Sequence, residues 1–144
     1  MNLRQLCHVL VWASVGTSAW GAAPACLQAA DIEAPMLMGR WQIEWRDGTH
    51  HRTEEPWVLT LGPHPEYAGS LKGMLSRGAA HHLVAADWDE DTLTMEESED
   101  GVHIAATWQA TATAGQCGQE LQGLRFTGSA PDASAPGFRM RKLP

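Results

Sequence analysis

Short runs that alternate apolar and polar residues follow one another from residue 39 to residue 143, and this repetition constrains the fold more than any other feature. In the first run Trp41, Ile43 and Trp45 alternate with polar residues, and a later pair of runs is separated by Asp100-Gly101, a strong hairpin signal. No stretch keeps apolar residues at positions i, i+3, i+4 and i+7, so no long helix is expected. The expected strands lie at residues 41–46, 57–61, 70–75, 81–88, 93–95, 102–109, 121–127 and 138–143.

Short strands joined by short connections are typical of an antiparallel barrel or sandwich. Closure into a barrel also removes the exposed strand edges that an open sheet would leave. We therefore predict an all-β fold, and within that class a single antiparallel up-and-down β-barrel of about eight short strands.

Residues 1–25 have the three regions of a secretory signal peptide. Arg4 supplies a positive start, residues 6–20 are mostly apolar or small, and Ala23 and Ala25 fit the small-residue rule for cleavage. The apolar region is too short to span a bilayer, and no later run approaches the roughly 18 apolar residues of a membrane helix. We expect an exported protein, periplasmic or secreted, with no transmembrane segment after cleavage.

Cleavage would leave an N-terminal arm at residues 26–38 and one β-barrel domain at residues 39–144. Arg4 leaves with the signal, so nine basic residues face seventeen acidic ones, a formal charge of −8. A chain this acidic is a poor candidate for binding nucleic acid or an anionic membrane surface. Its charge could attract a cationic partner, as could that of any acidic protein.

The mature chain would keep two cysteines, Cys26 and Cys117, because Cys7 lies in the signal. An even pair in an oxidising compartment favours a disulfide, which could stabilise the domain by about 3–5 kcal/mol. The alternative is that Cys26 becomes a lipidated first residue, although Ala23 stands where lipoprotein signals usually carry Leu. We favour the Cys26–Cys117 disulfide over the lipid anchor.

The first expected strand begins with Gly39-Arg40-Trp41, and the last one contains Arg139 and Arg141. In this respect the chain resembles the lipocalins and the wider group of calycin β-barrels. These carry a G-x-W on the first strand and an Arg at the end of the last strand. The resemblance implies a barrel in which Trp41 closes the floor beneath Arg139 or Arg141. Such a cation–π contact contributes about 0.5–2 kcal/mol.

Five tryptophans remain after the expected cleavage: Trp41, Trp45, Trp57, Trp88 and Trp108. Core packing of a small barrel accounts for residues of this kind, since aromatic rings supply large buried areas. A second interpretation makes Trp45, Trp57 and Trp108 the wall of a pocket that stacks on a flat ligand. Both interpretations need these side chains on the inner face of the barrel.

An acidic stretch at residues 87–100 is expected to form a charged hairpin rim. Glu96, Glu97 and Glu99 are its candidate contacts for a cationic protein partner, because complementary charge steers association.

Metal, cofactor and catalytic sites find no support in the sequence. His50-His51 and His81-His82 are adjacent pairs, and neighbouring strand residues point to opposite faces of a sheet. The acidic stretch lacks the Gly and the final Glu of an EF-hand calcium loop. No G-x-S-x-G nucleophile motif occurs. We expect no metal, no cofactor and no enzymatic activity.

Two functions remain. The first is an exported, non-enzymatic binding barrel that holds a small apolar or aromatic ligand, which requires a cavity of roughly 300 Å³ or more. The alternative is an interaction or inhibitor protein whose acidic rim binds a cationic protein partner. In that case the barrel interior would be filled, and salt would weaken binding by screening the rim charges.

Overall fold

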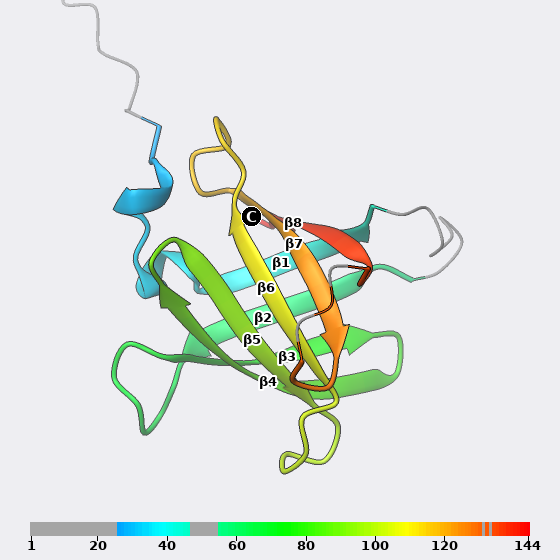
Figure 1. The fold of residues 1–144 in the computed structure, drawn as a ribbon. Coiled ribbons are helices and arrows are strands. Elements are labelled where there is room, and N and C mark those ends of the chain that lie inside the picture. Colours follow the sequence, from blue (N-terminus) through cyan, green and yellow to red (C-terminus); the bar gives the residue numbers. More distant parts are fainter. Residues whose placement is uncertain (1–25, 47–54, 131, 133) are drawn as a thin grey trace, which may run out of the picture.

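The computed structural model describes residues 26–46, 55–130, 132 and 134–144. The expected signal peptide and His50-His51 lie outside the described residues. Eight antiparallel strands follow one another around a closed barrel in sequence order, with β1 paired to both β2 and β8 (Figure 1). The strands are β1 (Gly39–Trp45), β2 (Trp57–Pro63), β3 (Leu71–Arg77), β4 (Ala80–Asp89), β5 (Thr92–Ser98), β6 (Ala106–Ala112), β7 (Glu120–Thr127) and β8 (Gly137–Lys142). The predicted all-β, up-and-down barrel is confirmed.

Alternation along each strand sends one set of side chains into the barrel and the other set to the surface. The inward set forms one continuous hydrophobic core. Its largest fully buried members are Trp41, Leu59, Leu71, Leu93, Met95, Trp108, Leu121, Phe138 and Met140. On β7, position 123 accommodates only a glycine, because a Cβ there would overlap the carbonyl oxygen of Gln109 on the neighbouring strand β6. Gly123 lies opposite Phe138 where β7 pairs with β8.

One end of the barrel is closed by the N-terminal arm, which contains the 3-10 turns η1 (Ala29–Asp31) and η2 (Ala34–Leu37). The arm places Leu37, which is fully buried, over the start of β1. There the indole Nε1 of Trp41 donates a hydrogen bond to the carbonyl of Leu37 at 2.8 Å. Lys142 donates from Nζ to the carbonyl of Met36, and its ammonium lies 5.5 Å from the centre of the Trp41 ring. Trp41 therefore closes the floor of the barrel.

Arg139 and Arg141 do not cover Trp41, so this prediction is wrong. β1 and β8 are antiparallel with Trp41 opposite Lys142, and residues opposite each other share a face of the sheet. Lys142 therefore takes the position over the ring, and the two arginines point outward. Arg139 pairs there with Glu44 at 2.5 Å, and Arg141 pairs with a Glu120 carboxylate oxygen at 2.7 Å.

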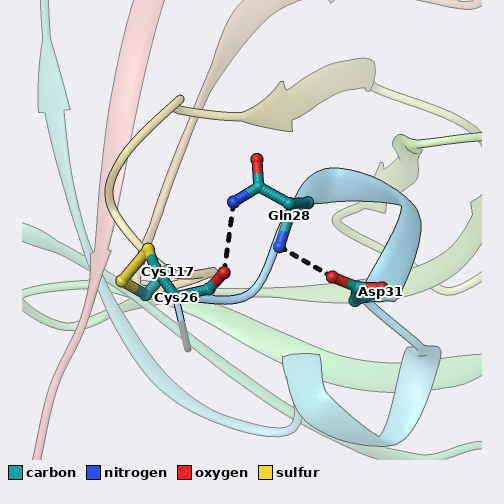
Figure 2. Close-up of a disulfide and its surroundings, with 4 residues drawn as sticks. All are labelled: Cys26, Gln28, Asp31 and Cys117. Atoms are coloured by element: carbon teal, nitrogen blue, oxygen red, sulfur yellow. Dashed lines mark hydrogen bonds between the residues drawn. A yellow bond between two sulfur atoms is a disulfide. The ribbon is translucent and has the colours of Figure 1, made fainter. Parts of the chain in front are cut away.

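The predicted disulfide joins Cys26 at the start of the arm to Cys117 in the loop between β6 and β7, with the two Cα atoms 4.6 Å apart (Figure 2). The side chain of Gln28 donates to the carbonyl of Cys26 at 3.1 Å, and its backbone N–H donates to Asp31 at 3.0 Å. Cys117 and Gly118 both have positive φ angles, +52° and +72°, which turns the loop back toward the arm. The bridge fastens the arm to the closed end of the barrel.

The strand expected at residues 102–109 begins four residues later, at Ala106. The reason is Asp100, whose Oδ1 accepts hydrogen bonds from the backbone N–H groups of Val102 and His103 at 2.9 and 2.8 Å. These local bonds compete with strand pairing. Val102 consequently lies in a loop with 79 % of its surface exposed.

We predict that removing the disulfide destabilises the fold without changing its architecture. The bridge closes a loop with a sequence separation of 91 residues, for which the chain-entropy model gives about 4–5 kcal/mol. Urea denaturation of Cys117→Ser, followed by tryptophan fluorescence, should show an unfolding free energy lower by this amount. The Cys26→Ser/Cys117→Ser double variant should lose no more than the single variant. An unchanged unfolding free energy under oxidising conditions would contradict the pairing.

Candidate functional site

The other end of the barrel, opposite the arm, is the candidate functional site, and we call it the mouth. It is where β1 ends, β2 begins, and the β3–β4 hairpin turns. The three tryptophans expected to line a pocket meet here. The ring centres of Trp45 and Trp57 are 5.8 Å apart, those of Trp45 and Trp108 are 5.5 Å apart, and those of Trp57 and Trp108 are 6.1 Å apart.

The three rings have different exposures. Trp108 is buried, packs edge-on against Phe138 with ring centres 4.9 Å apart, and belongs to the core. Trp45 and Trp57 are only half-buried and stand at the rim of the mouth. Of the predicted ligand-binding trio, Trp45 and Trp57 are therefore in a position to touch a ligand, while Trp108 supports them from below.

A charged cluster centred on Glu97 is in contact with these tryptophans. This carboxylate is fully buried, although it comes from the expected acidic rim. Its Oε2 accepts hydrogen bonds from Trp108 Nε1 at 2.8 Å and from Arg125 Nε at 3.0 Å, and its Oε1 lies 2.5 Å from Nδ1 of His82. Arg125 also stacks on Trp108, with its guanidinium carbon 5.3 Å from the ring centre.

Glu97 as a rim contact is therefore a wrong prediction. On β5 it shares the inward face with Leu93 and Met95, four and two residues earlier, so alternation brings it into the barrel. Glu96 does face outward on the same strand and is exposed, and Glu99 lies in the loop that follows. The alternation along the strand predicts an inward Glu97, whereas the acidic neighbours of Glu97 predict an exposed one.

The charge state of Glu97 follows from its partners. Burial alone would raise the pKa of this carboxyl group. The hydrogen bonds from Arg125 and His82, the positive charge of Arg125 and the hydrogen bond from Trp108 together hold the pKa below its ordinary value. Glu97 is thus an ionised acceptor at neutral pH, and each of its three partners donates to it. It follows that His82 carries a proton on Nδ1.

Beside this cluster the mouth contains a hollow of about 50 Å³. Trp57, Leu75, Arg77, Ala80 and His82 line it. The guanidinium carbon of Arg77 lies 5.0 Å from the centre of the Trp57 ring, and the edge of His82 meets the same ring with centres 6.5 Å apart. The indole nitrogen of Trp57 is buried and has no hydrogen-bond partner among the described residues.

Below the mouth, the inward side chains of all eight strands pack into the continuous core. The described residues hold no group of three or more His, Cys, Asp or Glu side chains that could bind a metal ion. They also contain no helix that is long and apolar enough to cross a membrane. No protein-family model matches the chain, and no curated protein matches it either. The site must therefore be interpreted from its geometry.

We predict that Glu97→Gln destabilises the protein by about 3 kcal/mol at pH 7, because Arg125 then keeps its charge without a carboxylate partner. The pKa of Glu97 is lowered in the folded state, so its stabilisation is complete above the ordinary value of 4.5 and disappears as pH falls through the folded value. The difference between wild type and Glu97→Gln should therefore shrink between about pH 5 and pH 3.

Denaturant unfolding at several pH values measures this difference. The control is Glu96→Gln, which removes an exposed carboxylate next to Glu97 and should change the unfolding free energy by less than about 0.5 kcal/mol. A difference that stays constant from pH 7 to pH 3 would show that Glu97 is not the ionised centre of the cluster.

Proposed function

We propose that this chain is an exported, non-enzymatic binding barrel of the calycin type, and that a small apolar or aromatic ligand binds at its mouth. The observation that carries the proposal is the pair of half-buried rings, Trp45 and Trp57, at the mouth. Among the described residues, the N-terminal arm covers the opposite end of the barrel and leaves this rim uncovered. Rings held in fixed positions offer a stacking surface at low entropic cost.

Packing supports a ligand location at the mouth. A ligand held inside the barrel needs a cavity of roughly 300 Å³ or more, whereas the inward side chains form one core and the hollow at the mouth measures about 50 Å³. The ligand would therefore lie on the rim with its flat part against Trp45 and Trp57. Binding in place of catalysis is supported by Glu97, whose two oxygens are already engaged by three donors.

The disulfide supports the proposal of export, because such bonds persist in oxidising compartments such as the bacterial periplasm or the extracellular medium. It also ties the arm to the closed end, which keeps the arm away from the mouth. A ligand can then reach the rim from solvent without displacing the N-terminal segment.

We predict that N-phenyl-1-naphthylamine, a neutral aromatic fluorophore, binds saturably to the mouth. Trp57→Leu should weaken this binding about tenfold, since it removes the half-buried ring, worth about 1.4 kcal/mol of contact. Trp88→Leu is the matched control, because Trp88 is also half-buried but stands near the closed end of β4. Equal affinities of the two variants, both folded by circular dichroism, would exclude the mouth as the site.

A second candidate function is supported by the charge of one wall. Strands β4, β5 and β6 carry no Lys or Arg. On the outer surface beside them, a groove of about 210 Å³ is lined by the apolar Leu83, Val102 and Ile104 and by Glu96, with Lys72, His64 and His103 also in its lining. These three apolar side chains are exposed by 42 %, 79 % and 39 %. An acidic wall with an apolar groove suits a cationic protein partner that also presents apolar side chains.

A peptide of alternating Lys and Leu tests this second function. It should shift the amide resonances of Leu83 and Val102 in an NMR titration, and the Glu96→Lys/Glu99→Lys variant should weaken its binding at least tenfold, with a similar loss in high salt. A peptide of alternating Glu and Leu is the control. If both peptides bind equally well, the acidic wall does not select a cationic partner.

A further inference from the structure

The hollow beside Trp57 has the size of a ligand head group. Its volume of about 50 Å³ accommodates about three or four non-hydrogen atoms, since one water needs about 10–15 Å³ of such volume. An apolar cavity that takes up benzene is about three times larger. The hollow is thus too small for an aromatic ring and large enough for a carboxylate or sulfonate group. A ring resting on Trp45 and Trp57 could place such a substituent inside it.

Two of the polar groups that line the hollow, Arg77 and Trp57, are hydrogen-bond donors. Arg77 presents a guanidinium, which carries only donors and matches the geometry of a carboxylate, and its position is supported by the ring of Trp57. Trp57 itself has a buried indole N–H without a hydrogen-bond partner among the described residues. Leu75 and Ala80 complete the lining and contribute no side-chain polar atom. A lining of this composition is suited to oxygen acceptors.

His82 is the third polar residue of the hollow, and it donates there only in its doubly protonated form. Since Glu97 accepts the Nδ1 proton of His82, the other ring nitrogen, Nε2, is the one left for a ligand. Nε2 has no hydrogen bond within the described residues and is not a buried atom, and 21 % of the His82 side chain is exposed. When the imidazole takes up a second proton, Nε2–H donates toward the hollow. Glu97 then balances the added charge from the opposite side of the ring.

From these contacts we infer that the mouth binds an aromatic anion, whose carboxylate or sulfonate group enters the hollow between Arg77 and His82 while its ring lies on the tryptophans. This inference rests on the proposed function and adds the chemical class of the ligand. Arg77 and His82 are the binding residues. Glu97 is a positioning residue, because it fixes the ring of His82 and does not itself face the ligand.

Two probes with the same ring skeleton separate this inference from the proposed function. 1-Anilinonaphthalene-8-sulfonate is N-phenyl-1-naphthylamine with one added sulfonate. At 150 mM salt the sulfonated probe should bind at least tenfold more tightly than the neutral one, in line with charge-assisted hydrogen bonds. Arg77→Met and His82→Gln should each lower the affinity for the sulfonated probe by a larger factor than the affinity for the neutral probe, so that most of the preference is lost.

Arg46→Met is the control, because Arg46 is an exposed arginine at the same end of the barrel whose Nη1 bonds Gln122 outside the hollow. It should keep the preference for the sulfonated probe. Equal affinity of the wild-type protein for the two probes, or equal losses in Arg77→Met and Arg46→Met, would overturn the inference while leaving the proposed function in place. If the neutral probe does not bind but the sulfonated one binds through Arg77 and His82, the anion site stands and the aromatic part of the proposed function falls. Binding of neither probe rejects both.

Discussion

The pairing of β1 with β8 is the constraint on which the rest of this structure depends. Once the first and last strands are hydrogen-bonded, the sheet has no edge, and each strand residue must point either into a confined interior or out to solvent. The register of Trp41 opposite Lys142 then decides which charges enter the barrel. Lys142 goes in and covers the floor, whereas Arg139 and Arg141 go out and pair with Glu44 and with the largely buried Glu120.

Much of the fold could be predicted from the sequence because alternation with period two is a direct consequence of strand geometry. The same principle locates Trp41 at the floor and brings Trp45, Trp57 and Trp108 to one end of the barrel. The alternation breaks at Val102, where the side chain of Asp100 holds the backbone in a local turn. Such a competition between a side chain and the strand ladder is decided by geometry that the pattern of apolar residues does not contain.

The candidate site was only half predictable. Its tryptophans are conspicuous in the sequence, but Arg77, His82, Glu97 and Arg125 come from four different strands, and nothing local links them. Glu97 illustrates the difficulty. Its position two residues after Met95 predicts an inward side chain, while its acidic neighbours suggest an exposed one. The fully buried carboxylate is explained only by its partners His82 and Trp108, on the neighbouring strands β4 and β6, and Arg125 on β7.

The two ends of the barrel are stabilised by different interactions, and the difference bears on function. At the closed end, the disulfide and the Trp41 hydrogen bond hold the arm against the barrel. The arm in turn shields the floor from solvent. At the mouth the barrel instead buries an ion pair between Glu97 and Arg125.

Buried ion pairs are costly to desolvate, and well-packed apolar residues in their place often give equal or greater stability. Stability alone therefore does not account for Glu97 at this position. The carboxylate does provide orientation, because it fixes Trp108 and the ring of His82. Both lie at the mouth, the only end in the described part of the chain where half-buried aromatic rings, a guanidinium and a hollow come together. This orientation of the histidine edge toward the hollow is what the proposed binding site requires, and it offsets the desolvation cost of the carboxylate.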